Sequence, residues 1–403
     1  MDLTHYRALG RSGLLVSPLA LGTMTFGAQR WGTDAAASRS VFDAYVEAGG
    51  NFVDTADLYS DGRSETILGD FIAEAGARER LVVATKSGFP RMQGNAHGGG
   101  NGAKNMRAAL DGSLARLRTD YIDLYWMHVW DRITPPEEVL QTLTDAVRAG
   151  RILHYGFSNT PAWYVARVAT LAQVHGLPAP IGLQYQYSLL DRGVELEVLP
   201  AGDALGLGLV PWSPLGGGLL TGKYGRDKLA DAARSARLPG DASGDDKARD
   251  DDDGRLDGDN PFGGMLFTDR NFDIVDVLRD VASAQARSMA EVALAWTVGR
   301  PGVSSVLVGA SRVAQLQQNI ASLDITLTAD QQQRLDDASR PPLPNPYFIF
   351  QLPPRMRFGV AHATGWAQRY RRSAHADAAQ PESPGGRESG LLQNRATVLH
   401  APR

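Results

Sequence analysis

The 403-residue sequence predicts an α/β protein built on a closed (β/α)8 barrel, the TIM barrel. Eight short apolar runs are typical of parallel strands, which are buried on both faces. A segment with helical spacing follows each run, and this alternation favours a parallel sheet. The runs are Pro18–Leu21, Asn51–Asp54, Leu81–Lys86, Tyr121–His128, Ile152–Phe157, Ile181–Gln184, Leu207–Trp212 and Ser304–Val308.

Two of the intervals between strands show the helical pattern clearly. Thr134-Pro135-Pro136-Glu137 has the form of a capping box, with proline at the first helical position. An apolar stripe with helical spacing follows this box, and a second stripe lies near the end of the barrel. The stripes are Val139, Leu140, Leu143 and Val147, and then Val313, Leu316, Ile320 and Leu323.

A doubly wound nucleotide-binding sheet is the alternative fold for strands that alternate with helices. Its fingerprint is GxGxxG directly after the first strand. The stretch Gly22–Gly27 does not match this pattern, and the glycines at 216–218 are followed by Thr221 where the third glycine should stand. The barrel is therefore favoured. Before its first strand, His5–Val16 predicts a hairpin that covers the barrel floor.

Length alone allows two or three domains, at about 150 residues each. Eight β/α units instead predict one barrel over residues 1–346, followed by a C-terminal extension over 347–403 that is partly disordered. The Asp-rich stretch Arg226–Asn260 is expected to be a solvated insertion after the seventh strand. A calcium loop in it would be centred on Gly254 or Gly258, but basic residues then occupy ligand positions, so no metal site is predicted.

Composition excludes several classes of function. The net charge of −4 does not fit a nucleic-acid-binding protein. The absence of cysteine excludes disulfides, thiol catalysis and cysteine-ligated metals. No run reaches the roughly 20 apolar residues that a membrane span needs, and the first residues lack the apolar core of a signal peptide. We therefore expect a cytoplasmic protein, and its oligomeric state is left open.

The chemistry of a barrel enzyme gathers at the carboxyl ends of its strands. Asp54, Lys86 and His128 each end a predicted strand, and Tyr59 follows Asp54 closely. Singly, each has an ordinary structural explanation, such as a turn, a solvated lysine or a packed ring. Together they form a coherent set for proton transfer to a small-molecule carbonyl substrate.

A tyrosine donates a proton readily near pH 7 only if its pKa falls well below its ordinary value near 10. A buried ammonium beside the phenol favours phenolate, and Lys86 on the adjacent strand is placed to supply it. Asp54 is then expected to hold Lys86, and His128 to orient the carbonyl oxygen. An electron source is still needed, which predicts a bound hydride donor.

Other strand ends suit a nicotinamide cofactor. Trp212 is placed to stack on the nicotinamide ring, while Ser158, Asn159 and Gln184 are placed to bind its carboxamide. The helix N-termini after strands seven and eight are the usual phosphate site of such barrels.

These segments resemble the aldo-keto reductases, and most closely the branch that includes potassium-channel β subunits and bacterial oxidoreductases. The resemblance covers Tyr6 to about Pro346. The matching stretches are Tyr6–Leu14, Leu21–Met24, Asn51–Tyr59 (NFVDTADLY), Ala84–Lys86, Asp120–His128 (DYIDLYWMH), Gly156–Asn159, Gln184–Arg192, Pro211–Tyr224 and Val308–Asn319.

The resemblance implies a catalytic tetrad of Asp54, Tyr59, Lys86 and His128, and NADP(H) as the cofactor. Arg312 agrees with NADP(H), because a guanidinium can pair with a 2′-phosphate. The implied cofactor contacts are Gly22, Thr23, Met24, Asp54, Ser158, Asn159, Gln184, Trp212, Ser213, Pro214, Leu215, Gly217, Lys223, Gly309, Ser311, Arg312, Gln315, Gln318 and Asn319.

The chain departs from the family pattern in three places. Ser60 stands after Tyr59 where relatives often have glycine, and Gln318 stands where they often have glutamate. The Asp-rich insertion replaces a stretch that often brings a basic residue over the cofactor, and its acidity would repel a pyrophosphate.

The predicted function is NADPH-dependent reduction of aldehydes or ketones to alcohols, with Tyr59 as general acid. The alternatives are a redox-sensing, nicotinamide-binding subunit with slow catalysis, and an NAD-dependent aldose or alcohol dehydrogenase. Substrate contacts are expected from Trp31, Tyr59, His128 and Trp130. The Gly-rich loop Gly88–Gly102 and the segment near Tyr347 are further candidate walls, and the loop is either a mobile lid or a long turn.

Overall fold

The computed structural model describes residues 1–28, 32–229, 256 and 265–360. Eight parallel strands form one sheet in the order β10-β3-β4-β5-β6-β7-β8-β9. Each strand overlaps one of the predicted runs, so the predicted α/β barrel is confirmed. The strands are β3 (Leu19–Gly22), β4 (Phe52–Asp54), β5 (Val82–Ser87), β6 (Ile122–Met127), β7 (Ile152–Ser158), β8 (Gly182–Gln184), β9 (Gly208–Leu209) and β10 (Val306–Val308).

Backbone contacts between the two outermost strands close the barrel. Leu209 in β9 forms a parallel bridge with Val303, which lies just before β10. The Ser304 amide donates to the Leu209 carbonyl at 2.9 Å, and the Leu307 amide donates to the Pro211 carbonyl at 2.9 Å. Closure leaves neither strand with a fully unpaired edge.

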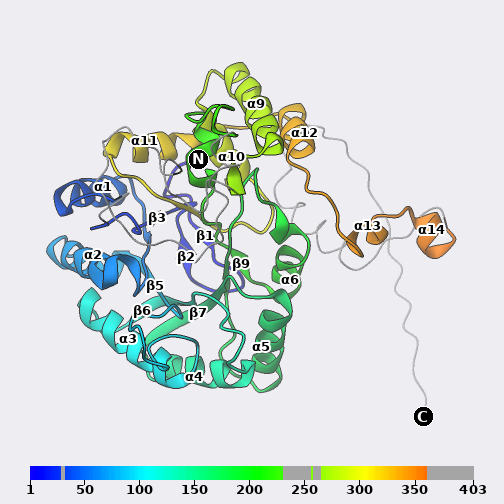
Figure 1. Cartoon of the computed structure of the whole chain (residues 1–403). Coiled ribbons are helices and arrows are strands. Elements are labelled where there is room, and N and C mark those ends of the chain that lie inside the picture. The colour runs from blue at the N-terminus through cyan, green and yellow to red at the C-terminus, as the bar shows by residue number, and fades with distance from the viewer. Residues whose placement is uncertain (29–31, 230–255, 257–264, 361–403) are drawn as a thin grey trace, which may run out of the picture. The chain divides into compact units, whose positions relative to one another are not determined.

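Helices surround the strands on the outside (Figure 1). Both predicted apolar stripes face inward: Val139, Leu140 and Leu143 are buried in α4, and Leu316 is buried in α11. The helices are α1 (Ala35–Glu47), α2 (Arg63–Glu74), α3 (Ala103–Leu117), α4 (Pro136–Arg148), α5 (Ala162–Val174), α6 (Val198–Leu205), α9 (Asp269–Ala284), α10 (Met289–Val298), α11 (Val313–Ala321) and α12 (Ala329–Ala338).

The predicted capping box before α4 is wrong. The helix begins at Pro136, one residue later than a Thr134 cap requires, and Pro135 is the N-cap and provides no side-chain bond. The Thr134 hydroxyl donates instead to the Asp131 carboxylate at 2.6 Å, and the Thr134 amide donates to the same group at 2.9 Å. Thr134 therefore belongs to a local turn with Asp131 that precedes the helix.

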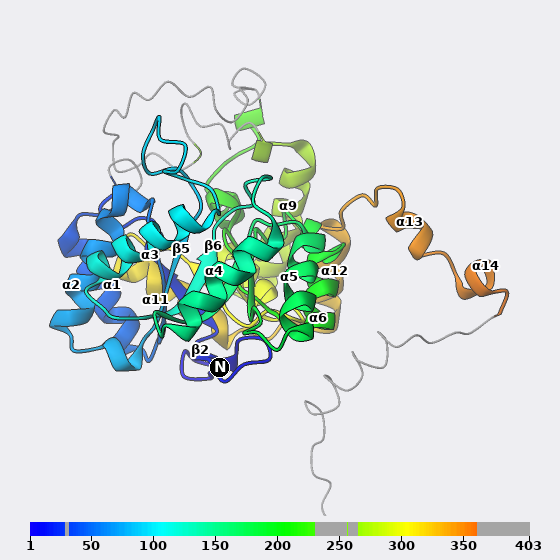
Figure 2. The same cartoon turned by 90° about the horizontal axis from the view of Figure 1, so that it is seen from below.

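The predicted N-terminal hairpin is present as β1 (Arg7–Ala8) and β2 (Leu15–Val16), which pair antiparallel. Leu9 and Val16 are fully buried and belong to the apolar cluster inside the barrel, with Phe52 and Leu124 among its members. The hairpin therefore closes one end of the barrel, while the loop before α3 rises from the opposite end (Figure 2).

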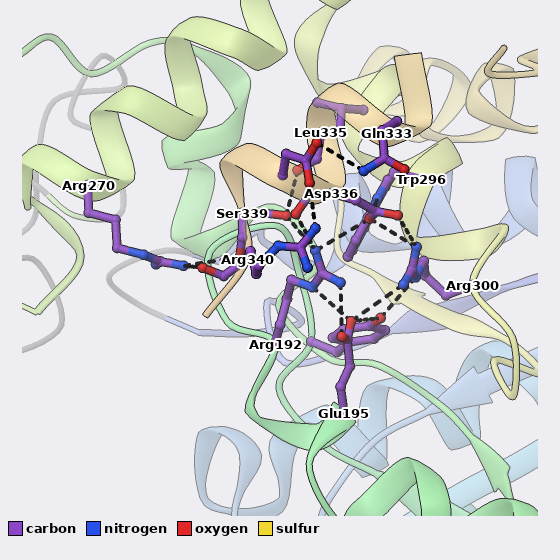
Figure 3. Close-up of polar contacts among 12 residues, drawn as sticks. Arg192, Glu195, Arg270, Trp296, Arg300, Gln333, Leu335, Asp336, Ser339 and Arg340 are labelled. Carbon is purple, nitrogen blue, oxygen red and sulfur yellow. Dashed lines mark hydrogen bonds and ion pairs between the residues drawn. The ribbon is translucent and has the colours of Figure 1, made fainter. Parts of the chain in front are cut away.

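A network of charges joins α12 to the barrel (Figure 3). Asp336 in α12 accepts hydrogen bonds from the Trp296 indole at 3.0 Å and from Arg300 at 3.0 and 3.1 Å. Arg192, in the loop after β8, donates to the Asp336 backbone carbonyl at 3.0 Å and pairs with Glu195 at 2.8 Å. The last helix of the barrel unit is thereby bonded to two separate barrel segments.

The described chain divides into two compact units, Met1–Leu343 and a second unit that begins at Pro344. In the second unit the structure describes two short helices, α13 (Tyr347–Phe350) and α14 (Pro354–Phe358). Most of the predicted Asp-rich insertion and the extension beyond residue 360 lie outside the described residues. The predicted boundary at residue 346 stays a prediction.

Candidate active site

Strand alternation places the site above an apolar layer inside the barrel. Successive side chains of a strand point to opposite faces. Phe52, Val82, Ala84, Leu124 and Val210 are buried in the interior cluster. Two residues beyond Phe52, Ala84, Trp126 and Val210 of this cluster, the inward positions are the predicted site residues Asp54, Lys86, His128 and Trp212.

Lys86 lies at the centre of the site and is fully buried. Its ammonium donates to the Asp54 carboxylate, to the Thr55 carbonyl at 2.6 Å and to the Tyr59 phenol oxygen at 3.3 Å. A lysine has three N–H donors, and each has an oxygen partner here. Tyr59 stands in the 3₁₀ turn η1 (Tyr59–Gly62), which directly follows the Asp54 strand.

The Asp54–Lys86 pair is buried, with 1% of the Asp54 residue exposed. Burial raises the pKa of the Asp54 carboxyl, and Lys86, Gln184 and Trp126 act against that rise. Burial alone would lower the pKa of Lys86, but the Asp54 carboxylate and then Tyr59 outweigh it and raise the pKa above the ordinary value. Lys86 is therefore held as an ammonium.

His128 follows β6 and faces Tyr59, with the two ring centroids 6.0 Å apart and the planes at 80°. Phe89 also packs edge-on against the histidine, with centroids 4.8 Å apart. Burial, and then the nearby Lys86 charge, lower the pKa of His128 well below its ordinary value. The imidazole is therefore neutral at pH 7 and able to donate one hydrogen bond.

Trp126 is a further partner of Asp54 that the sequence analysis did not single out. Its indole donates to the second carboxylate oxygen at 3.0 Å. A side chain at the glycine of either of the next two strands, β7 and β8, would collide with this ring, since a Cβ at Gly156 would lie 2.4 Å from the indole and one at Gly182 would lie 2.9 Å from it. Trp126 shares the inward parity of His128, so strand alternation could have identified it.

The four residues predicted to face a nicotinamide ring lie close together. Gln184 donates its amide to Asp54 at 2.9 Å, which leaves its carbonyl oxygen as an acceptor. The Asn159 amide donates to Ser158 Oγ at 3.0 Å and to the His128 carbonyl at 3.0 Å. The Trp212 indole donates to the Asn159 carbonyl oxygen at 3.3 Å. One network therefore links this cluster to the tetrad.

The backbone turns sharply beside this cluster. Asn159 and Ser213 both adopt positive φ, at 47° and 53°. Asparagine tolerates this region better than most residues, but serine does not, and such strain collects at functional sites. Pro214 and Leu215 lead from Ser213 into the glycine turn η4 (Gly216–Thr221), where Gly217 has φ 64°. Lys223 follows this turn, with its ammonium 5.0 Å from the Tyr224 ring.

The predicted adenosine end lies at the start of α11. Gln315 accepts from the Ser311 amide and hydroxyl, both at 2.9 Å, and Asn319 donates to the Gly309 carbonyl at 3.4 Å. Arg312 is the N-cap of α11, and both Arg312 and Gln318 are exposed.

The first-strand residues lie beside Asp54. Thr23 is buried and its amide donates to the Asp54 carbonyl at 2.9 Å, while Gly22 is in register with Asp54. Met24, the next residue, is half-buried.

The predicted substrate walls have different outcomes. Trp31 lies outside the described residues. Trp130 is half-buried and packs edge-on against Trp163, with ring centroids 5.7 Å apart. Phe89 lies within the predicted loop wall, is 36% exposed, and stands nearest to His128 of these rings. The described part of the chain brings together no three potential metal ligands. Nor does it contain a helix long and apolar enough to cross a membrane.

Comparison with known proteins identifies the family. The model of the Aldo/keto reductase family matches residues 18–340. An uncharacterized oxidoreductase of Bacillus subtilis is 34% identical over 83% of this chain and 95% of its own. A probable voltage-gated potassium channel subunit beta of rice is 34% identical over 80% of this chain and 92% of its own. An aryl-alcohol dehydrogenase [NADP(+)] of Phanerodontia chrysosporium is 31% identical over 86% and 88%.

These matches confirm the predicted resemblance, including the branch with bacterial oxidoreductases and channel β subunits. The chain therefore belongs to the aldo/keto reductase family, a family of oxidoreductases.

Proposed function

We propose that this protein is an NADPH-dependent reductase of aldehydes or ketones, with Tyr59 as the general acid. The observation that carries the proposal is the position of the Lys86 ammonium, which bonds both the Asp54 carboxylate and the Tyr59 oxygen. Because Tyr59 accepts from Lys86, its own proton can be donated to a substrate carbonyl oxygen. The neutral His128 donates a second hydrogen bond that orients the same oxygen.

The residues around the site fit a nicotinamide cofactor. Gln184 and Ser158 offer neutral hydrogen-bonding groups, and Trp212 offers a half-buried ring beside them. A Cβ at Gly309 would meet no atom within 4 Å, so the backbone there is open to a close approach. When bound, NADPH supplies the hydride. We propose that Ser158, Asn159, Gln184 and Trp212 bind its carboxamide and ring.

The other cofactor contacts are proposed from the family resemblance. They are Gly22, Thr23, Met24, Ser213, Pro214, Leu215, Gly217, Lys223, Gly309, Ser311, Arg312, Gln315, Gln318 and Asn319.

An aromatic carbonyl compound is the proposed substrate class. The aryl-alcohol dehydrogenase among the relatives acts, by its name, on aryl alcohols, which are the reduced form of aromatic carbonyl compounds. The exposed Phe89 ring beside His128 offers flat apolar surface of the kind that stacks on an aromatic ring.

A Tyr59→Phe variant tests the proton donor. It should lose most turnover of a benzaldehyde panel, by about 100-fold or more as expected for a missing general acid, while NADPH still quenches its tryptophan fluorescence. Tyr6→Phe, at the opposite end of the barrel, is the control and should retain full activity. Full activity of Tyr59→Phe would remove tyrosine from the mechanism.

A redox-sensing subunit with slow catalysis is a second candidate, because a rice channel β subunit is among the relatives. Steady-state NADPH consumption separates the two functions, and rapid turnover with simple aldehydes excludes a sensor.

An NAD-dependent aldose or alcohol dehydrogenase is the third candidate function. Arg312→Ala should weaken NADP binding about tenfold or more without affecting NAD, as expected for a lost guanidinium–phosphate pair. Unchanged NADP affinity would contradict the choice of cofactor.

The same proposal places the reaction in the cytoplasm, in keeping with the absence of cysteine from the chain.

A further inference from the structure

A second acidic residue lies between Asp54 and Tyr59, and the proposed reaction does not use it. Asp57 has 1% of its side chain exposed. Its backbone amide donates to the Lys86 carbonyl at 3.1 Å, so its main chain is joined to the lysine strand. Two residues later the same turn presents Tyr59 to the Lys86 ammonium. A displacement of Asp57 would therefore move the proposed proton donor.

Arg91 of the Gly-rich loop reaches this buried carboxylate. Arg91 Nε lies 3.1 Å from Asp57 Oδ2, and a quarter of the arginine side chain is exposed. No other ion pair of Asp57 occurs within the described residues. The contact joins a solvent-facing loop to the interior of the catalytic turn.

The base of the loop has separate anchors. The Gly100 amide donates to the Gly88 carbonyl at 2.7 Å, and Asn101 bonds both the Val129 carbonyl and the Asp131 carboxylate. Farther out in the loop, the Arg91 amide donates to the Gly98 carbonyl at 2.9 Å, which is a contact within the loop itself. The Arg91–Asp57 pair thus joins the outer loop to the barrel, close to Phe89 on His128.

The titratable groups around Asp57 come from the loop, α2, α3 and β6, and they are Arg91, Glu65, Arg116 and Tyr125. Glu65 of α2 is fully buried and accepts from Thr85 in β5 and from Arg116 in α3. Tyr125 of β6 adds a neutral phenol, because burial raises its pKa far above the working range. Burial, and then the Glu65 charge, raise the pKa of Asp57 to about 7, against the opposing effects of Arg91 and Arg116.

An ionised carboxylate in this position costs folding free energy, so its presence calls for a functional reason. We propose that the Arg91–Asp57 ion pair is a latch that holds the Gly88–Gly102 loop closed over the substrate and keeps Tyr59 in place, and that it engages only while Asp57 is ionised. Asp57 and Arg91 are positioning residues, and this inference rests on the proposed reductase function. Protonation of Asp57 releases Arg91, and the loop then opens.

Loop closure can be measured without catalysis, by limited chymotryptic cleavage after the exposed Met92, since Pro90 prevents cleavage after Phe89. Cleavage rates are normalised to a peptide substrate at the same pH. In the wild type, cleavage should accelerate as the pH falls through about 7, where Asp57 protonates. Asp57→Asn and Arg91→Gln should be cleaved rapidly at pH 8 and show no such step. Arg91→Lys, which keeps the charge, and Asp61→Asn, on an exposed position of the same turn, should behave like the wild type.

Steady-state kinetics supply the second measurement. Asp57→Asn and Arg91→Gln should lower kcat/KM for an aromatic aldehyde by about 10- to 100-fold, mainly through KM, as expected for a misplaced loop and acid. In the wild type, kcat/KM should decrease below about pH 7 as one proton binds to Asp57. Asp57→Asn should show no such decrease. Because the amide is isosteric and uncharged, this variant should unfold at a temperature no lower than the wild type at pH 8.

The latch is refuted if Asp57→Asn stays protected from chymotrypsin at pH 8 and keeps the wild-type KM and pH profile. If Asp57→Asn does not fold, the exposed-loop variant Arg91→Gln decides by the same measurements. If the wild type reduces no carbonyl compound, the proposed function fails, and the cleavage experiment still tests the latch by itself.

Discussion

Replacing Asp336 with alanine is expected to detach α12 from the barrel and lower the free energy of unfolding. This carboxylate accepts from the Trp296 indole, from Arg300 and, at 3.4 Å, from Arg192. The side chain is 22% exposed, and the two arginines are 15% and 8% exposed, so water can replace the lost acceptor only in part.

The size of the effect follows from these partners. A hydrogen bond to a charged group contributes about 1.5–3 kcal/mol, and an arginine left without its carboxylate inside a protein costs more. Glu195 limits the loss, because it pairs with Arg192 at 2.8 Å and lies 3.7 Å from Arg300. We therefore expect Asp336→Ala to cost about 2–4 kcal/mol.

Urea unfolding, followed by circular dichroism, measures this loss as a shift of the midpoint at constant m-value. Asp337→Ala is the matched control, because it makes the same chemical change on the next residue of the same helix. The Asp337 side chain is 55% exposed and pairs with Arg340, which is 63% exposed, so its midpoint should stay near the wild type. Equal midpoints for the two variants would show that the network does not hold α12.

Two further predictions concern the barrel interior. Gly156→Ala should cost about 1–3 kcal/mol of unfolding free energy, because the added methyl meets the Trp126 indole and the Gly182 carbonyl, whereas Gly13→Ala meets no atom within 4 Å and should be neutral. A Gly156→Ala variant as stable as Gly13→Ala would contradict the packing. His128 should stay neutral in NMR titrations from pH 8 to pH 6, because its pKa is lowered in the folded protein. The unfolded histidine takes up a proton near pH 6.5, and the folded one does not. The contribution of His128 to the free energy of unfolding is therefore fully present above about pH 6.5, and it decreases below that pH by up to about 1.4 kcal/mol per pH unit. Protonation of folded His128 near pH 6.5 would refute its assignment as a buried neutral donor.

The fold was predictable because buried parallel strands leave continuous apolar runs, and all eight runs correspond to strands. The capping box before α4 was wrong, because Thr134 belongs to a turn with Asp131 and the helix starts one residue later, at Pro136. Real capping boxes begin α10 at Ser288 and α12 at Thr328, where the hydroxyl accepts from the amide three residues farther on.

The polar centre of the site was predictable from strand ends, which bring Asp54, Lys86 and His128 to one end of the barrel. The Arg91–Asp57 pair was not, since it joins a loop to a turn across a distance in sequence that no local pattern encodes. The sequence shows that position 57 carries an acidic residue. Its burial could not be predicted, because it depends on how α2 and α3 pack against β5.

The Trp126 ring has a consequence for how this barrel can change. It occupies space that side chains at Gly156 and Gly182 would otherwise fill, while it bonds Asp54. Enlarging either glycine requires a smaller ring at position 126, and a smaller ring without an N–H leaves the carboxylate short of a donor. Positions 126, 156 and 182 should therefore accept substitutions as a set rather than one at a time, and a redesign of the barrel interior has to alter all three together with the partner of Asp54.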